Sequence, residues 1–226
     1  MQQTTAQSGP DGRVKRLDAD ESGSVGLVVE SSDGKNFILT CSHVAMGGRP
    51  EDRGGYFVDE DIQVELRGRQ TNYGCVRFSF MDNEQESALV ELSELDANEW
   101  RNELPDGTQI GHVLNVPSEG QRVSFFSSLN YKEVSGEIIR LNVSQITIEY
   151  GPVTATFDNL IEVGMKNGSI TYTISEKGDS GSVVYSENYE PIGMIIGGNS
   201  NATYIVPIQR ILDKTETTIK QHVHLT

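Results

Sequence analysis

The stretch KGDSGSVVYSENYEPIGMIIGG occupies residues 177–198 and places Ser180 on a turn between two glycines. An aspartate precedes the serine, and the apolar residues Val183 and Val184 follow it as the start of a strand. Glycine adopts backbone conformations that other residues avoid, so this turn can bend sharply and expose the hydroxyl. Such a turn either ends a loop or presents a nucleophile together with backbone N–H groups. The positions of histidine and carboxylate residues elsewhere in the chain distinguish the two.

The composition is that of a turn-rich β protein with an acidic surface. The 226 residues include 23 glycines and are 36% apolar, which suits one large domain or two small packed ones. The balance of 18 basic and 33 acidic residues gives a net charge of −15, which argues against nucleic acid or an anionic membrane as a partner. Cys41 and Cys75 are too few for a disulfide framework and lack the spacing of a zinc site, and Cys41 is expected to be a small buried thiol. With no apolar run typical of a signal peptide or membrane span, we expect a cytoplasmic protein without metal or organic cofactor.

Short β-type runs separated by turns fill most of the chain. The first set lies at 24–30, 36–40, 61–68, 75–80 and 87–92, and the second at 122–127, 133–142, 145–150, 159–163, 182–186, 191–198 and 202–208. A short helix is expected at 93–104, and the apolar spacing after Pro207 predicts a helix at the C-terminus. The pattern therefore predicts an all-β fold of two packed barrels. The expected parts are a flexible lead at 1–22, a first barrel at 23–95, a linker at 96–120, a second barrel at 121–206 and a C-terminal helix at 207–226.

Two further segments supply a histidine and a carboxylate next to predicted strands. FILTCSHVA (38–46) puts His43 just past a strand, and QESALVEL (85–92) puts Glu86 immediately before one. Either residue alone would be interpreted as a packing or solvated residue. Together with Ser180 they occur in the chain order histidine, acid, serine, which is the order of one known type of serine-hydrolase triad. This order favours the nucleophile interpretation of the glycine turn.

The chain resembles the chymotrypsin-fold, trypsin-like serine peptidases, and most of all their disulfide-free bacterial and intracellular branch. The resemblance covers roughly residues 22–212. It rests on SVGLVVESSDGKNFILTCSHVA around His43, on ESALVEL around Glu86, and on the 177–198 stretch around Ser180. It implies two packed six-stranded Greek-key barrels that carry a serine endopeptidase acting through an acyl-enzyme intermediate.

The resemblance also implies a role for each residue of these motifs. The Ser180 hydroxyl would attack the scissile carbonyl, His43 would take its proton and pass it to the leaving amine, and Glu86 would hold the other ring nitrogen. The turn formed by Gly178, Asp179 and Ser180 would make the oxyanion hole, with the N–H groups of Gly178 and Ser180 as donors.

The sequence departs from the family pattern in three respects, of which Ser182, where many relatives have glycine, is a mild change. Glu86 stands where the family usually has aspartate, and its extra methylene requires a folded rotamer or a shifted strand. Asp82, in the preceding loop, is therefore kept as an alternative orienter of the histidine. Asp179, in secreted relatives, pairs with an N-terminus created by cleavage, but the usual Ile-Val-Gly-Gly start is absent here. Activation by cleavage is not expected.

By the same resemblance, the primary specificity pocket lies beside the serine. Ile174, six residues before the nucleophile, would form its base, where no carboxylate could pair with Lys or Arg. The walls would come from Ile196, Gly197, Gly198, Ala202 and Thr203. The resemblance thus implies an uncharged, hydrophobic or small residue before the cleaved bond.

Three functions stay open at this stage. The first is a serine endopeptidase acting on a peptide or protein substrate, with regulatory domains or a partner protein as an option for its control. The second is a catalytically inactive protease-like module that binds a peptide or partner in the same groove, which the departure at Glu86 keeps open. The third, an esterase, would use the same residues on another acyl substrate. His112, His222 and His224 are interpreted as surface or packing residues.

Overall fold

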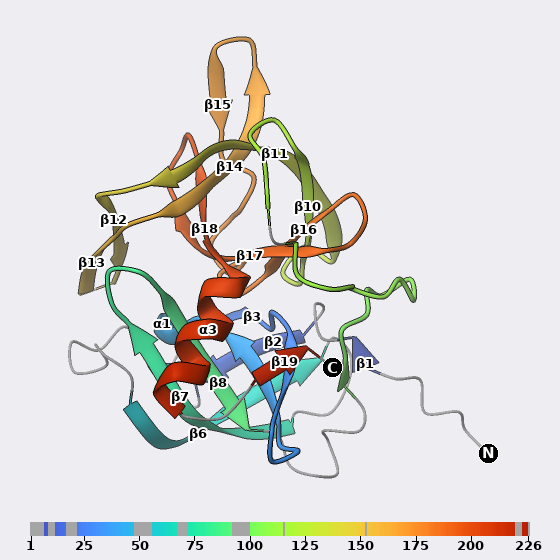
Figure 1. Cartoon of the computed structure of the whole chain (residues 1–226), viewed down its shortest axis with the longest axis vertical. Coiled ribbons are helices and arrows are strands. Elements are labelled where there is room, and N and C mark those ends of the chain that lie inside the picture. Colours follow the sequence, from blue (N-terminus) through green and yellow to red (C-terminus); the bar gives the residue numbers. More distant parts are fainter. Residues whose placement is uncertain are drawn as a thin grey trace.

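The computed structural model describes residues 7–8, 12–16, 22–47, 56–66, 72–91, 100–114, 116–151, 153–219 and 223–225. They form two barrels stacked along the long axis of the molecule, with the N-terminal one below and the C-terminal one above in Figure 1. Most of the predicted helix at 93–104 lies outside the described residues. Its described part begins with the short strand β9 (Trp100–Arg101), which pairs in parallel with β1 (Gln7–Ser8).

The first barrel is a curled sheet in the strand order β19-β4-β5-β8-β7-β6-β2-β3. Its strands are β2 (Gly12–Arg16), β3 (Ser22–Ser24), β4 (Val28–Ser31), β5 (Asn36–Thr40), β6 (Tyr56–Leu66), β7 (Asn72–Met81), β8 (Glu86–Glu91) and β19 (Val223–Leu225). β3 and β4 are two halves of one bent segment. At the bend, the N–H of Val25 donates to Gly12 on β2, and the N–H of Gly26 donates to Leu39 on β5. The bend thus joins the two ends of the six-stranded core of this sheet.

The second barrel closes on itself with six strands in the order β11-β10-β16-β17-β18-β14, because β11 also pairs with β14. Its strands are β10 (Arg122–Ser127), β11 (Lys132–Val143), β14 (Leu160–Asn167), β16 (Val183–Ser186), β17 (Pro191–Gly198) and β18 (Thr203–Pro207). β15 (Ile170–Tyr172) extends β14 into a projecting hairpin (Figure 1). β12 (Ile146–Tyr150) and β13 (Val153–Phe157) form a separate two-stranded arm. The predicted all-β fold of two packed barrels is confirmed.

Alternating apolar residues fill each barrel and the layer between them. Val14 and Ile38 belong to the core of the first barrel, and Phe125 and Ile205 to that of the second. The largest buried cluster spans both barrels, and it includes Phe37, Leu39, Phe126, Tyr185, Met194 and Ile208. Each such side chain contributes about 1.5–3 kcal/mol when it leaves water. This shared apolar layer holds the barrels together.

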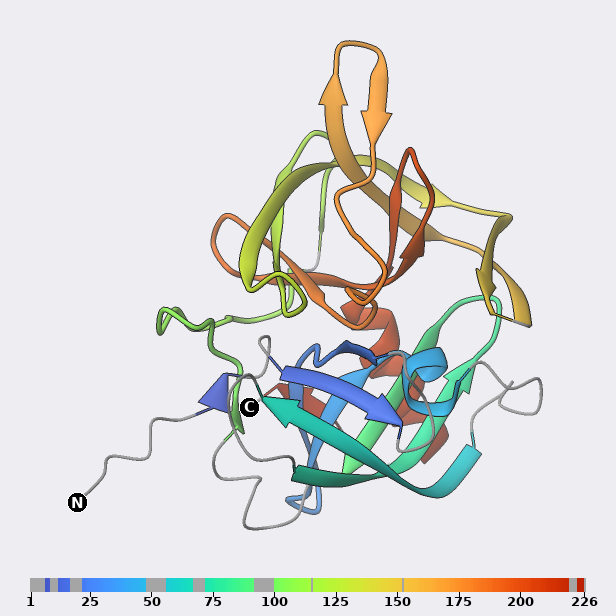
Figure 2. The ribbon, with the colours of Figure 1, turned by 180° about the vertical axis from the view of Figure 1, so that it is seen from behind.

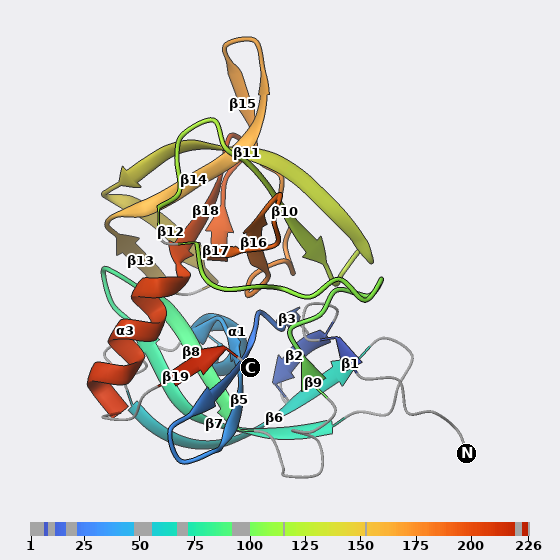
Figure 3. The same cartoon turned by 45° about the vertical axis from the view of Figure 1, so that its right-hand side comes forward.

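The helix α3 (Ile208–Ile219) lies across the outside of both barrels, as Figures 1 and 3 show. Ile208 and Ile211 are fully buried on its inner face, which agrees with the predicted C-terminal helix. The helix ends before β19, whose residues return to pair with β4. Within the described ranges, no helix is long and apolar enough to traverse a lipid bilayer.

The predicted flexible lead at 1–22 differs from the structure at residues 12–16. These residues form β2, which pairs with both β3 and β6. The segment GRVKR is polar in composition, but Val14 alternates with its charged neighbours and is fully buried in the first barrel. The buried register of Val14 and Arg16, together with the pairing to β3 and β6, therefore fixes this strand in the sheet.

Candidate active site

A cleft of about 680 Å³ opens between the two barrels, and His43, Gly178 and Ser180 all line it. His43 comes from the first barrel and the Gly178–Ser180 turn from the second. The β12–β13 arm also reaches this cleft, with Tyr150 in its lining. Figure 2, seen from behind, shows the arm descending from the second barrel beside the helix α1 (Ser42–Met46). The fold therefore brings the predicted histidine and serine to one cleft from distant parts of the sequence.

His43 lies in the single turn of α1, directly after β5. Gly47, with φ of 76°, ends this helix in the left-handed conformation, and its N–H donates to the carbonyl of His43 at 2.9 Å. The side chain of His43 is 17% exposed. A short helix between a strand end and a glycine turn thus fixes the backbone that carries the imidazole.

Glu86, the first residue of β8, lies beside the imidazole and is fully buried. Its Oε1 accepts the backbone N–H of His43 and lies 3.1 Å from Nδ1 of the ring. The two atoms are close, but they do not form a hydrogen bond. Neither Nδ1 nor Oε2 of Glu86 has a hydrogen-bond partner among the described residues. A rotation of the imidazole would align the pair.

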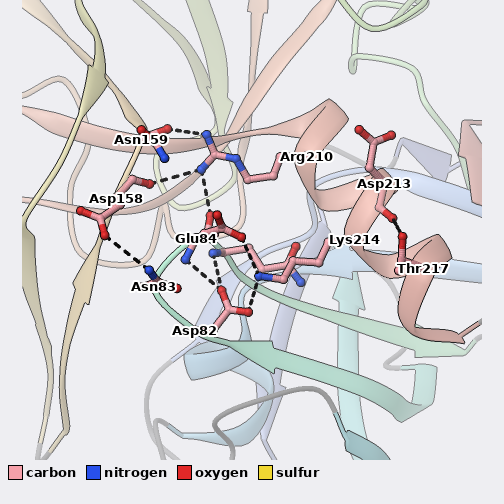
Figure 4. Close-up of polar contacts among 10 residues, drawn as sticks. Asp82, Asn83, Glu84, Asp158, Asn159, Arg210, Asp213, Lys214 and Thr217 are labelled. Atoms are coloured by element: carbon pink, nitrogen blue, oxygen red, sulfur yellow. Dashed lines mark hydrogen bonds and ion pairs between the residues drawn. The ribbon is translucent and has the colours of Figure 1, made fainter.

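Asp82, the alternative orienter, points toward Lys214 on α3 (Figure 4). Its carboxylate pairs with the ammonium of Lys214 and accepts the N–H groups of Glu84 at 2.9 Å and of Gln85 at 3.0 Å. These contacts fix the 82–85 loop against the helix. The acid next to the histidine is therefore Glu86.

The imidazole of His43 stacks on the ring of Tyr150 at the end of β12, with ring centroids 4.2 Å apart and an interplanar angle of 20°. Burial, reinforced by the nearby Glu86 carboxylate, raises the pKa of the Tyr150 phenol well above its ordinary value. No hydrogen bond links the Ser180 hydroxyl to the imidazole within the described part of the chain. In this structure the ring packs on the arm of the second barrel.

Ser24 on β3 holds the turn that carries Ser180. Its hydroxyl donates to the carbonyl of Gly178 at 3.2 Å, and its N–H donates to the carbonyl of Ser180 at 2.7 Å. Gly178 and Gly181 have φ of 106° and 96°, a region that favours glycine. A Cβ on Gly181 would lie 2.2 Å from the carbonyl oxygen of Ser24. Within the described residues, the N–H groups of Gly178 and Ser180 donate to no acceptor, and both residues line the cleft.

Arg13 on β2 supports the same turn from the first barrel. Its guanidinium donates to the hydroxyls of Ser22 at 3.1 Å and Ser128 at 3.2 Å. Ser128 in turn bonds the hydroxyl of Ser24 at 2.8 Å. A Cβ on Gly178 would lie 3.2 Å from Arg13 Nη2, so the guanidinium lies directly against the turn. Arg13 and Ser24 could not be predicted from the sequence, because nothing local to them signals a contact with residues 178–180.

Asp179 points inward and is fully buried. Its carboxylate accepts the Ser127 hydroxyl at 2.7 Å and the N–H of Glu176 at 2.8 Å. Burial raises the pKa of this carboxyl above its ordinary value, although these two hydrogen bonds act in the opposite direction. Asp179 thus anchors the turn through neutral donors on the second barrel.

Only part of the predicted specificity pocket lines the cleft. Ile196, Gly197 and Gly198 do so, together with Thr173 and Ser175. Ile174, expected at the base, is instead packed in the core of the second barrel, because side chains alternate along 173–175. Ala202 and Thr203 are also buried and lie behind the lining. The Thr203 hydroxyl bonds those of Thr173 and Ser175, each at 2.8 Å, so this wall of the cleft carries hydroxyl groups.

Cys41 is buried as expected, and its thiol donates to the carbonyl of Ile195 at 3.1 Å. Burial raises the pKa of the thiol well above its ordinary value. Cys41, His43 and Glu86 bring together three side chains of the kinds that bind metals. His112 is exposed, while His222 and the side chain of His224 lie outside the described residues.

Comparison with solved structures identifies the architecture. Thermobifida fusca protease A is similar with a TM-score of 0.64 and 13% identity, over 97% of this chain and 100% of that one. The Nocardiopsis protease NAPase matches with a TM-score of 0.61 and 16% identity, over 94% and 95% of the two chains. A chymotrypsin from Cellulomonas bogoriensis matches with a TM-score of 0.60 and 17% identity, over 98% and 99%. No protein-family model matches the sequence.

Proposed function

Because the chain has the fold of the chymotrypsin-like serine proteases, we propose that it is a serine endopeptidase with Ser180 as its nucleophile. The observation that carries the proposal is the meeting of His43 and Ser180 at one cleft, with the buried Glu86 carboxylate 3.1 Å from His43 Nδ1. His43 is the general base and Glu86 its positioning acid.

The reaction begins when His43 takes the proton of Ser180 as the hydroxyl oxygen bonds to the substrate carbonyl carbon. The imidazole then carries a positive charge beside Glu86, whose full burial reduces the screening of their attraction by water. His43 returns the proton to the leaving amine, and water hydrolyses the acyl-enzyme by the same sequence of steps.

The N–H groups of Gly178 and Ser180 stabilise the oxyanion of the tetrahedral intermediate. One such donor is worth about 3 kcal/mol of transition-state stabilisation. Ser24 and Arg13 are positioning residues for these donors, because they contact the turn and not the reacting atoms.

The imidazole reaches Ser180 by rotating away from its stack on Tyr150. Catalytic hydrogen bonds are often long or misaligned in unliganded enzymes and shorten when substrate binds. The same rotation brings Nδ1 into line with Glu86, so one movement completes both hydrogen bonds of the triad.

The proposed substrate carries an uncharged, hydrophobic or small residue before the cleaved bond. The lining at Gly197 and Gly198 leaves room, and the hydroxyls of Thr173 and Ser175 offer hydrogen bonds but no charge. A positional-scanning peptide library tests this preference. A clear preference for Arg or Lys at that position would contradict it.

Labelling with a fluorophosphonate probe tests the nucleophile. We expect stoichiometric labelling at neutral pH that disappears in Ser180→Ala and persists in Ser175→Ala, a serine that lines the same cleft. An unlabelled wild-type chain would favour the inactive binding module. Hydrolysis of a peptide amide in addition to an ester distinguishes the endopeptidase from an esterase.

A further inference from the structure

Three side chains with metal-binding atoms, one of them the imidazole of His43, lie close together at the cleft. The thiol sulfur of Cys41, a ring nitrogen of His43 and a carboxylate oxygen of Glu86 all lie within 4.8 Å of one another. Cys41 and Glu86 are fully buried, and His43 forms the side of the cluster that faces the cleft. Cys41 is the cap residue of α1 and His43 lies in its single turn, whereas Glu86 comes from β8. The spacing of these residues in the sequence therefore gave no sign of the cluster.

Two atoms of the cluster lack hydrogen-bond partners. Nδ1 of His43 and Oε2 of Glu86 are buried, and neither has a partner among the described residues. A buried polar atom without a partner costs about 1–3 kcal/mol. The thiol of Cys41 donates to the carbonyl of Ile195 and also lies beside the Glu86 carboxylate, and thiols are weak donors. The cluster therefore offers a ring nitrogen and a carboxylate oxygen without partners, next to a thiol held only by weak hydrogen bonds.

Thiolate, imidazole and carboxylate together are a ligand set for zinc. Zn²⁺ accepts all three, and sites with three protein ligands keep the fourth tetrahedral position for water. Mg²⁺ and Ca²⁺ prefer sites made of oxygen atoms, so a thiolate disfavours them. We propose that Cys41, His43 and Glu86 bind Zn²⁺ and that the bound ion inhibits the enzyme.

The inhibitory part rests on the proposed peptidase function and follows from the tautomer of the imidazole. Catalysis needs a proton on Nδ1 and a lone pair on Nε2 to accept the Ser180 proton. A metal on Nδ1 leaves the neutral ring with its proton on Nε2, so the ring has no lone pair for the serine. Binding forms a Zn–S bond and breaks the S–H bond of Cys41, and that proton passes to solvent. The ion also occupies the carboxylate that would stabilise the imidazolium.

Cobalt substitution tests the site without any measurement of activity. Titration of the full chain with Co²⁺ should give the ultraviolet charge-transfer band of a cobalt–thiolate bond, saturating at one equivalent, and Zn²⁺ should abolish it. The chain has two cysteines, so the matched control is the half-buried Cys75 on β7. Cys75→Ser should keep the band, and both Cys41→Ser and Cys41→Ala should lose it. No band in the wild type, or a band that survives in a folded Cys41 variant, would overturn the proposal.

Inhibition is measured on the same variants with a peptide amide, each relative to its own metal-free rate. The Zn²⁺ concentration for half-inhibition should rise by about 100-fold or more in Cys41→Ser, since loss of an outer-shell partner alone costs 10–100-fold in metal affinity. Cys75→Ser should match the wild type. Equal sensitivity of all three chains would overturn inhibition through this site. A Cys41-dependent cobalt band in a chain that hydrolyses nothing would support the metal site and reject the peptidase.

Discussion

Replacing Ser24 with alanine should slow acylation of Ser180 while leaving its hydroxyl in place. The change removes two hydrogen bonds, one from the Ser24 hydroxyl to the Gly178 carbonyl and one between the hydroxyls of Ser24 and Ser128. It keeps the bond from the Ser24 N–H to the Ser180 carbonyl. A neutral hydrogen bond contributes about 1 kcal/mol, and complete loss of an oxyanion donor costs about 3 kcal/mol. These limits correspond to a decrease in kcat of between about fivefold and about 150-fold. KM should change little, because the donor acts on charge that develops in the transition state.

Ser31→Ala is the matched control for this prediction. Ser31 is a buried serine at the far end of β4, and its hydroxyl donates to Asp33 and to the carbonyl of Lys35. Each variant loses two hydrogen-bond contacts, so both should lose about 1–2 kcal/mol of unfolding free energy in urea. Only Ser24→Ala should lose kcat on a peptide amide. An equal decrease in both variants, or an unchanged kcat in Ser24→Ala, would refute the role of Ser24 in positioning the turn.

Other contacts predict separate outcomes. Glu86→Gln should lower kcat/KM on a peptide amide by about 10⁴-fold, as for the corresponding carboxylate change in a serine protease, whereas Asp82→Asn should have little effect because Asp82 faces Lys214. Equal losses would contradict this assignment. Arg210→Met should lower the free energy of unfolding by about 2 kcal/mol, because the Arg210 guanidinium donates to three backbone carbonyls at the base of α3 (Figure 4). Urea unfolding measures this loss. Because the pKa of Asp179 is raised in the folded state, the folded chain binds this proton more tightly than the unfolded chain does. The contribution of this carboxyl to stability therefore falls as pH rises from its ordinary pKa of 3.8 through its pKa in the folded state. Asp179→Asn should flatten that slope in unfolding curves recorded across the window, and an unchanged slope would exclude the effect.

Strands with a regular apolar pattern could be predicted from the sequence almost to the residue. The runs at 36–40 and 191–198 match β5 and β17 in both limits, because turn residues flank each run. β2 was missed because four of its five residues are glycine or charged. Its position depends on pairing with β6 and on the burial of Val14, and neither is visible within the segment. Composition alone could not separate this strand from a flexible lead.

The same limit applies to the candidate site. His43 and Ser180 lie in motifs whose local residue types already indicate chemistry. Ser24 touches Gly178 across 154 positions of sequence, and its hydroxyl is one among many in the chain. Tyr150 reaches the imidazole only because the β12–β13 arm extends to the first barrel. Supporting residues of this kind are set by tertiary pairing, so a single sequence does not mark them.

The glutamate at position 86 is explained by what its longer side chain reaches. The first backbone N–H groups of a helix have no partner within the helix, and the α1 cap residue, Cys41, provides no side-chain bond to them. Oε1 of Glu86 accepts one of these groups, the N–H of His43, and lies beside the same residue's imidazole. A single carboxylate oxygen from β8 thus accepts the backbone N–H of the histidine and lies within reach of its ring. Aspartate at the start of β8 would be shorter by one methylene. Its carboxylate would reach either the backbone N–H or the ring nitrogen of His43, but not both. The departure from the usual residue therefore couples the position of α1 to the orientation of the base.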